Sequence, residues 1–185
     1  MDRTEMIALI RGGVPPGNGL WADLGAGTGN FTQALRALLG PDSTIYALDR
    51  DAKAIAAQQS SAEMAAGAEI RPVQADFTRP LDLPPLDGVL MANALHFVRD
   101  QTTVLAHVAG CLRPTGRFLL VEYDVPSPMP WVPFPVPPEC FEALARQAGL
   151  SVPQVIGSRR SPSTGIRMYA AVALRKPTGQ GSRQG

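Results

Sequence analysis

The sequence has few of the residues that build disulfide frameworks or metal sites. It contains two cysteines and two histidines among 185 residues, and no group of His, Cys, Asp and Glu has the spacing of metal ligands. We therefore expect no metal. Cys111 and Cys140 both lie in apolar helical contexts, and we interpret both as core thiols.

The sequence also lacks long apolar runs and any strong excess of charge. No stretch approaches the roughly 18 apolar residues of a membrane span, and residues 1–5 contain Asp2 and Glu5 where a signal peptide would be basic. A cytoplasmic protein without a membrane span is predicted. The formal net charge of +1 argues against a nucleic-acid partner. Residues 151–185 carry six basic and no acidic side chains, which favours solvated hairpin ends over an anion-binding patch.

What is present is a pattern of short apolar segments alternating with longer helical ones. With 45% hydrophobic residues, the chain can bury one substantial core, and we expect a single domain over residues 1–176 with a disordered tail at 177–185. The alternation predicts an α/β fold, a Rossmann-like, mostly parallel sheet with helices on both faces.

Periodicity and turn residues place the individual elements. Strands are expected at 20–24, 44–48, 69–74, 88–92, 117–122, 152–157 and 166–174. Helices are expected in the opening residues before Gly12 and at 30–39, 51–66, 100–112 and 139–148, with a turn at 113–116 and an extended proline-rich segment at 125–138. Pro72 lacks a backbone donor, so the third strand should lie at a sheet edge.

A glycine-rich turn joins the first strand to the next helix. It reads Asp23-Leu-Gly-Ala-Gly-Thr-Gly-Asn30, and its glycines allow a tight turn and close approach of a ligand to the backbone. A dinucleotide fingerprint would need Gly or Ala where Asn30 stands, and a phosphate loop would need a Gly-Lys-Ser/Thr ending. Neither NAD or FAD binding nor nucleotide hydrolysis is favoured.

This acid-x-Gly-x-Gly-x-Gly motif resembles that of class I S-adenosylmethionine-dependent methyltransferases, small-molecule type, similar to those of ubiquinone and menaquinone biosynthesis. The resemblance implies a seven-stranded sheet of order 3-2-1-4-5-7-6 with strand seven antiparallel. It also implies S-adenosylmethionine as cofactor and S-adenosylhomocysteine as product. The cofactor-binding residues carried over from the family are Asp23, Gly25, Ala26, Gly27, Gly29, Asp49, Arg50, Asp76, Phe77, Asn93 and Ala94.

The family assigns a role to each of these positions. Asp49, at the end of the second strand, would accept hydrogen bonds from the ribose hydroxyls. Asp76 and Phe77 would contact adenine, although Asp76 could instead cap a turn. Asn93 and Ala94 would line the methionine end. Asp23 would lie near the methionine part, or bond the amides of its own turn.

Catalytic candidates follow the fourth and fifth strands. His96 could serve as a base for an enol, phenol or activated carbon acid, or could pack as a structural histidine. His107 is interpreted as structural. Tyr123 and Asp124 could orient the acceptor. Trp131 and Phe134, in the proline-rich segment, could form an apolar lid or a rigid surface connection.

The sequence thus predicts transfer of a methyl group to O, C or N of a small-molecule acceptor by direct displacement, in a monomer or homodimer. No Asn/Asp-Pro-Pro-aromatic sequence follows the fourth strand, which disfavours nucleobase or glutamine methylation. Methylation of RNA or protein through an Arg159-Arg160 loop stays open, as does a non-catalytic S-adenosylmethionine-binding protein. The short N-terminal portion predicts an acceptor pocket that is open or completed by another subunit.

Overall fold

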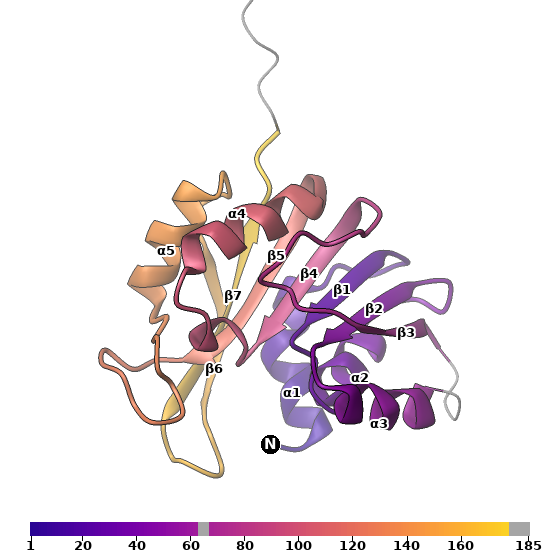
Figure 1. Ribbon diagram of the computed structural model, residues 1–185, viewed down its shortest axis with the longest axis horizontal. Helices are drawn as coiled ribbons and strands as arrows, with labels where there is room; N and C mark the ends of the chain where they lie inside the picture. Colours follow the sequence, from indigo (N-terminus) through magenta and orange to yellow (C-terminus); the bar gives the residue numbers. More distant parts are fainter. Residues whose placement is uncertain (63–66, 178–185) are drawn as a thin grey trace, which may run out of the picture.

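The computed structural model describes residues 1–62 and 67–177, which fold into one seven-stranded sheet covered by helices (Figure 1). The strands are β1 Leu20–Leu24, β2 Thr44–Asp49, β3 Glu69–Gln74, β4 Leu86–Ala92, β5 Leu112–Tyr123, β6 Gln154–Arg160 and β7 Arg167–Leu174. The helices are α1 Arg3–Ile10, α2 Asn30–Arg36, α3 Ala52–Ala62, α4 Gln101–Cys111 and α5 Pro138–Gln147, with short 3-10 turns η1 Arg11–Gly13 and η2 Leu95–Phe97.

The strand order is β3-β2-β1-β4-β5-β7-β6, as predicted. Neighbours from β3 to β5 are parallel, whereas β7 runs antiparallel to both β5 and β6. Pro72 lies in edge strand β3 opposite Ala47 of β2, so its missing donor costs no ladder bond on the open side. Because β1, β2, β3 and β4 all point the same way, the residues that follow them gather at one edge of the sheet.

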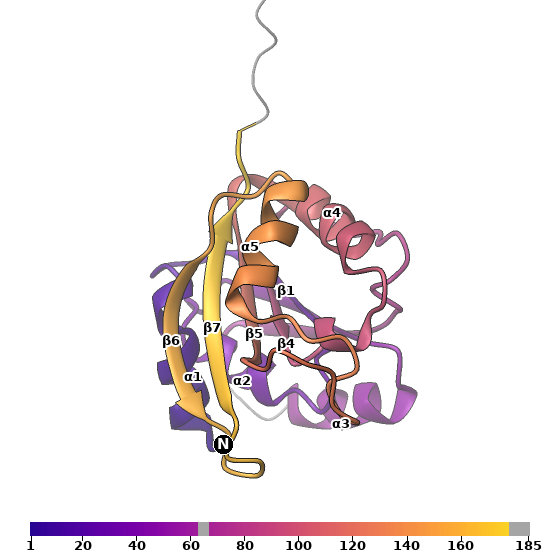
Figure 2. The ribbon, with the colours of Figure 1, turned by 90° about the vertical axis from the view of Figure 1, so that its left-hand side faces the viewer.

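Both faces of the sheet are buried. Helix α1 lies on one side of the sheet and α4 and α5 lie on the other (Figure 2). The side of α1 and α2 packs around Trp21, Leu35 and Leu119, and the opposite side packs around Phe118 and Phe141. Two buried faces explain why the central strands are apolar almost without interruption.

Several predicted boundaries and one burial prediction need correction. Helix α2 ends at Arg36 rather than near 39, and the predicted turn at 113–116 lies inside β5, where Thr115 has φ 66° and the register with β4 shifts. The last strands begin at Gln154 and Arg167 instead of 152 and 166. Residues 63–66 of the predicted third helix and residues 178–185 of the predicted tail lie outside the described residues.

The prediction that Cys140 is a core thiol was wrong. Helix α5 buries Phe141 and Ala145, one turn apart, and this leaves Cys140 on the exposed side. Cys111 is only partly buried, at the end of α4, with its Sγ 3.5 Å from the carbonyl oxygen of His107.

Candidate active site

The glycine-rich turn after β1 supplies the backbone of the site. The amides of Gly25 and Ala26 both donate to the carbonyl of Leu48, each at 2.9 Å, which folds the turn against the end of β2. Gly25 has φ 74°, and a Cβ there would lie 2.6 Å from the Cβ of Ala94. Gly27 has φ 54°, but a Cβ there would meet no described atom within 4 Å. The missing side chain at Gly25 therefore lets Ala94 pack closely against the turn, whereas the missing side chain at Gly27 leaves open space.

Asp49 links the end of β2 to this turn. Its Oδ2 accepts the amide of Gly27 at 2.8 Å, and its Oδ1 accepts the amide of Asp51 at 2.9 Å. The carboxylate still has lone pairs for hydroxyl donors, because each oxygen accepts more than one hydrogen bond. Asp49 is thus held in place before any ligand arrives.

A cavity of about 180 Å³ lies beside Asp49. It is lined by Gly25, Asp49, Arg50, Asp76, Phe77, Thr78, Asn93, Ala94, Phe97 and Val98. The structure therefore brings together the predicted residues that follow β2, β3 and β4. Phe97, which is 59% exposed, is a lining residue that the sequence analysis missed.

Asp76 caps a turn, which is one of its two predicted roles, and it also lines the smaller cavity. Its Oδ1 accepts the amide and hydroxyl of Thr78, at 3.0 and 2.7 Å, so it caps the turn after β3. The hydroxyl bond and then the amide bond hold the pKa of Asp76 below its usual range. At the same time Asp76 lines the cavity, where the ionised carboxylate can accept a further hydrogen bond.

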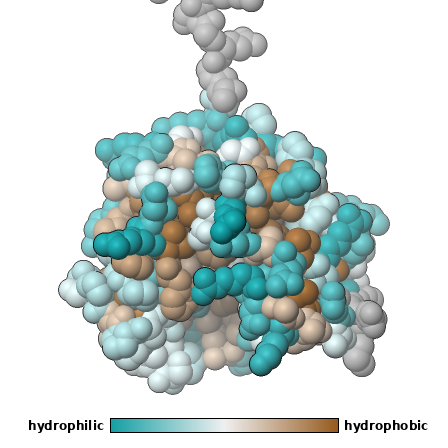
Figure 3. All heavy atoms as spheres, viewed as in Figure 1, coloured by the Kyte–Doolittle hydropathy of each residue, from teal (hydrophilic) through white to brown (hydrophobic). Residues whose placement is uncertain are grey.

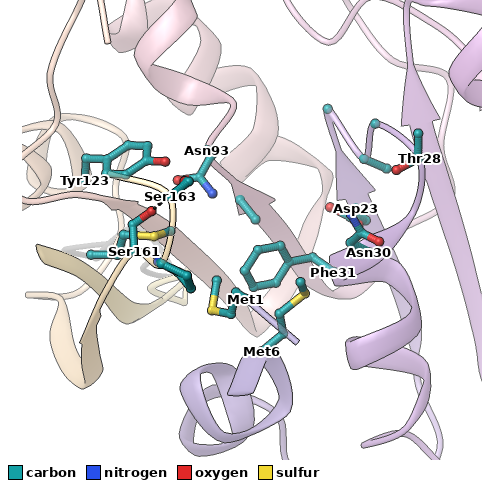
Figure 4. A pocket seen from close by; sticks show the side chains of 16 residues that line it. Met1, Met6, Asp23, Thr28, Asn30, Phe31, Asn93, Tyr123, Ser161 and Ser163 are labelled. Carbon is teal, nitrogen blue, oxygen red and sulfur yellow. Dashed lines mark hydrogen bonds between the residues drawn. The ribbon is translucent and has the colours of Figure 1, made fainter. Parts of the chain in front are cut away.

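A larger cavity of about 360 Å³ adjoins the first and shares Gly25 and Asn93 with it. It is lined by Met1, Met6, Asp23, Gly25, Ala26, Gly27, Thr28, Asn30, Phe31, Ala92, Asn93, Tyr123, Ser161, Pro162, Ser163 and Met168 (Figure 4). A hollow is visible near the middle of the face drawn in Figure 3, where the strands of Figure 1 end. Together the two cavities run along the carboxyl edge of β1, β2 and β4.

Two buried oxygens in the larger cavity have no hydrogen-bond partner among the described residues. Asp23 Oδ2 accepts the hydroxyl of Thr32 at 2.7 Å, but Oδ1 has no partner, and neither has Oδ1 of Asn93. Burial raises the pKa of Asp23 to about 7. Asn93 has φ 53°, a left-handed conformation in which Asn is enriched. A ligand that brings a hydrogen-bond donor or a positive charge to these two oxygens would be favoured, because buried acceptors are normally hydrogen-bonded.

His96 forms a buried pair that the sequence analysis did not foresee. Its Nδ1 lies 2.6 Å from Oε2 of Glu122, and its amide donates to the other carboxylate oxygen at 3.1 Å. The two side chains are 2% and 1% exposed, and neither residue lines the two cavities. No sequence motif singles out Glu122, because it lies in a predicted strand whose other residues are mostly apolar. The pair ties η2 to the end of β5.

The other residues predicted to contact the acceptor lie in different parts of the structure. Tyr123 lines the larger cavity, and the centroid of its ring lies 6.1 Å from the centroid of the His96 ring. Asp124 instead pairs with Arg167 at 3.4 Å. Phe134 donates its amide to the carbonyl of His96 at 3.0 Å and, like Trp131, lines neither of the two cavities. The proline-rich segment is therefore docked on η2 at this point.

The sequence of residues 22–118, more than half of the chain, matches the family described as "Methyltransferase domain". The chain belongs to this family. The match extends from β1 through most of β5 and so contains the glycine-rich turn and both predicted aspartates, Asp49 and Asp76. Its strand order is that of the class I S-adenosylmethionine-dependent methyltransferases.

Known proteins share this methyltransferase fold. The O-methyltransferase cnsE of Penicillium expansum is 26% identical over 167 residues, which cover 82% of this chain and 59% of that protein. The chain thus spans less than two thirds of that curated relative. The structure of YcgJ from Bacillus subtilis is 13% identical, with a TM-score of 0.75 over 94% of this chain and 99% of that one. The 1,6-didemethyltoxoflavin-N1-methyltransferase of Burkholderia thailandensis is 19% identical, with a TM-score of 0.72 over 95% and 78% of the two chains.

The cavities of this methyltransferase fit the family's cofactor. S-adenosylmethionine carries an ammonium and a sulfonium charge. The unpartnered oxygens of Asp23 and Asn93 can accept hydrogen bonds from the ammonium, and their negative charge density also favours a nearby sulfonium. The open space beside Gly27 admits a ligand against the backbone. The smaller cavity offers the carboxylates of Asp49 and Asp76 to the donors of an adenosine.

Much of the lining of the larger cavity was missed by sequence analysis. The lining residues without a predicted site role are Met1, Met6, Thr28, Asn30, Phe31, Ala92, Ser161, Pro162, Ser163 and Met168. They come from the N-terminus and α1, from the glycine-rich turn and α2, from the end of β4, from the loop between β6 and β7, and from β7 itself. Helical or strand periodicity assigns such apolar residues to the core, so no sequence signal separates them from packing residues.

The arginines of the β6–β7 hairpin are engaged within the methyltransferase. Arg159 donates to Glu5 of α1, and Arg160 donates to the carbonyl of Gly165 at 3.0 Å. These contacts favour the structural interpretation of the basic C-terminal part over an anion-binding patch. Among the residues that the structure describes, no helix combines the length and apolar character needed to cross a membrane.

Removing the carboxylate of Asp49 should weaken cofactor binding at least about tenfold, because hydrogen bonds to a charged group contribute roughly 1.5 to 3 kcal/mol. Calorimetric titration of Asp49→Ala with S-adenosylhomocysteine measures this loss. Asp51→Ala is the matched control, since Asp51 is exposed and lines neither cavity. Equal affinity in the Asp49 variant and the wild type would refute a ribose-binding role.

Proposed function

We propose that this chain, as a single domain over residues 1–176, transfers a methyl group from S-adenosylmethionine to a small-molecule acceptor. The observation that carries the proposal is the pair of adjoining cavities that meet at Gly25 and Asn93. One is bordered by the carboxylates that suit adenosine, and the other extends past the turn to Tyr123 and the β6–β7 loop. A donor and an acceptor can thus lie side by side.

We assign the cofactor to both cavities. Asp49, with neighbouring Arg50, binds the ribose, while Asp76 and Phe77 bind adenine. Gly25, Ala26, Gly27 and Gly29 form the turn beneath the methionine part, and Asp23, Asn93 and Ala94 border it. When bound, S-adenosylmethionine supplies an electrophilic methyl group whose displacement leaves S-adenosylhomocysteine. The chain's own task is to align the acceptor atom with that methyl group and to exclude water.

For an acceptor that must lose a proton, we propose His96 as the base and Tyr123 as the group that orients the acceptor. Glu122 accepts from Nδ1 of His96, which leaves Nε2 as the basic nitrogen. Because His96 lines neither cavity, Tyr123, whose ring lies 6.1 Å away, is placed to connect acceptor and base. An acceptor of the quinone-precursor type, as in ubiquinone and menaquinone biosynthesis, fits such proton removal.

Titration of the protein with S-adenosylmethionine, S-adenosylhomocysteine and NAD tests the proposal. We expect micromolar binding of the two sulfur nucleosides and none of NAD. Binding of NAD alone would overturn it. A chain that binds S-adenosylmethionine but produces no S-adenosylhomocysteine with any acceptor tried would be a binding protein rather than an enzyme.

Removing the hydroxyl of Tyr123 should lower kcat and leave cofactor affinity unchanged, because the residue borders the acceptor side. Tyr169→Phe is the control: that hydroxyl donates to the carbonyl of Val136 at 2.6 Å inside the core, so its loss should lower stability rather than kcat. The measurement is single-turnover methyl transfer beside cofactor titration. Equal kcat in Tyr123→Phe and wild type would remove Tyr123 from the mechanism.

A further inference from the structure

Helix α3 carries a polar side chain on its buried face. Ala54, Ile55 and Gln58 are all buried and lie on one side of the helix, and Gln58 is 1% exposed. Its neighbour Gln59 is exposed. Burying an amide side chain costs free energy unless the amide is hydrogen-bonded, and an apolar side chain would fill the same place without that cost. The contact that the Gln58 amide makes therefore indicates what the residue does.

This amide binds the glycine-rich turn. Nε2 of Gln58 donates to the carbonyl oxygen of Gly27 at 2.6 Å. A Cβ at Gly29 would lie only 3.3 Å from Cγ of Gln58, so the absence of a side chain at Gly29 leaves room for the contact. The hydrogen bond ties α3 to a turn that precedes it by a whole strand and helix, and no local sequence pattern predicts it.

The backbone of Gly27 is thereby held on both sides. Its amide donates to Oδ2 of Asp49 at 2.8 Å, and its carbonyl accepts from Gln58. That amide and that carbonyl belong to the two planar peptide groups that flank the Cα atom of Gly27. Gly27 has φ 54°, and glycine has more backbone freedom than any other residue. The two side chains therefore restrain the turn at a point where the chain by itself would be most variable.

The restrained part of the turn borders the larger cavity. Gly27 and Thr28 line that cavity, whereas Gly25 is the one residue of the turn that also lines the smaller cavity. The methionine part of the cofactor is assigned to the turn, and the adenosine part to the smaller cavity. A turn that already has its binding conformation needs no ordering when the ligand arrives, and this raises affinity.

We infer that Gln58 is a positioning residue for the cofactor. It holds the peptide group between Gly27 and Thr28 in the conformation that receives the methionine part of S-adenosylmethionine. Gln58 lines neither cavity, so it acts through the turn and not by touching the ligand. The inference rests on the proposed function, which places the methionine part over this turn.

Gln58→Met tests the inference, because methionine has a similar length but no donor. Calorimetric titrations compare S-adenosylhomocysteine with methylthioadenosine, which lacks the amino-acid end. Affinity for S-adenosylhomocysteine should fall by about fivefold to tenfold, the size expected for one lost buried hydrogen bond. Affinity for methylthioadenosine should stay within about twofold of wild type. Gln59→Met, on the exposed side of the same helix, should change neither.

Two results of these titrations would overturn the inference. One is a Gln58→Met protein that binds S-adenosylhomocysteine as tightly as wild type. The other is an equal loss of affinity for both ligands, which is what a purely structural role of Gln58 would produce. If Gln58→Met does not fold, Gln58→Ala repeats the comparison, since alanine also lacks the donor and favours the helix.

Amide hydrogen exchange gives a second, local measurement. In Gln58→Met the amide of Gly27 should exchange about fivefold faster or more, while the amides within β2 keep their wild-type rates. Saturating S-adenosylhomocysteine should slow the exchange again. An unchanged rate at Gly27 would show that Gln58 does not restrain the turn.

These outcomes are separate from those of the proposed function. If the wild-type protein does not bind S-adenosylhomocysteine, the proposed function fails and this inference with it. If the wild type binds but the variants do not follow the expected pattern, Gln58 is a packing residue and the methyltransferase assignment stands.

Discussion

Asp23→Asn should make the cofactor-free protein more stable at pH 8 and should weaken its binding of S-adenosylmethionine. Asp23 is 1% exposed, and burial raises its pKa to about 7, far above the roughly 3.9 of an unfolded chain. Asparagine has nearly the same shape and still accepts the hydroxyl of Thr32. The variant therefore removes a costly buried charge without removing the hydrogen bond.

The sign of the pH dependence follows from the raised pKa. Between about pH 4 and 7 the folded protein holds a proton on Asp23 that the unfolded chain has released. This contribution to stability is fully present below the unfolded pKa and is lost as the pH rises through the folded value, about 7. At pH 8 the loss is on the order of 3 to 4 kcal/mol, so the advantage of Asp23→Asn should be absent near pH 4 and largest above pH 7.

With rising pH the affinity for the cofactor should increase, whereas the stability of the cofactor-free protein should decrease. The ammonium and sulfonium charges of S-adenosylmethionine favour the ionised carboxylate, so wild-type affinity should rise as the pH increases through 7. Asp23→Asn should lose at least about tenfold in affinity at pH 8, the equivalent of 1.4 kcal/mol, and lose the pH dependence with it.

Thermal unfolding and calorimetric titration from pH 5 to pH 8 measure both effects. Asp82→Asn, which changes an exposed carboxylate outside the two cavities, serves as the control and should alter neither curve. A wild-type protein whose stability does not fall toward pH 8 would contradict the raised pKa. Wild-type cofactor affinity in Asp23→Asn would contradict its place beside the methionine part.

Gly27→Val should weaken cofactor binding by about a hundredfold or more while leaving the sheet folded. A side chain at this position enters open space within the larger cavity, where the ligand must approach the turn. The positive φ of 54° adds a backbone cost of roughly 1 to 2 kcal/mol for any non-glycine residue. Stability should therefore fall modestly, whereas affinity should fall by about a hundredfold or more, because steric exclusion removes many contacts at once.

Gly149→Val separates these two contributions. Gly149 also has a positive φ, 75°, and open space around its Cβ, but it lies after α5 and lines neither cavity. Both variants should lose a similar amount of stability in denaturant unfolding, and only Gly27→Val should lose binding of S-adenosylhomocysteine. Loss of binding in both would point to a general disturbance of the fold.

Local patterns were sufficient for the sheet and for much of the cofactor side. The glycine turn lies between a five-residue strand and a helix, and carboxylates follow successive parallel strands. In a parallel sheet the ends of such strands meet at one edge, so Asp49, Asp76 and Asn93 line one cavity, as their positions predict. Which of them bind the cofactor stays a prediction.

The surroundings of some side chains could not be predicted, because burial and contacts between residues far apart in the sequence determine them. In the sequence Glu122 is one residue of a predicted strand, and only the folded chain brings the ring of His96 next to its carboxylate. Cys140 was predicted to be a core thiol from its apolar helical context, whereas α5 buries the face with Phe141 and leaves Cys140 exposed.

The sequence by itself determined the order of the elements, the edge position of β3 and the turn that leaves room for a ligand, since these depend on neighbouring residues and on rules of strand pairing. Only the tertiary structure decided which side chains line the larger cavity. Periodicity does not distinguish Met6, Phe31 and Met168 from core residues. They line a cavity because α1 packs against α2 and the β6–β7 hairpin, and β7 packs against β5.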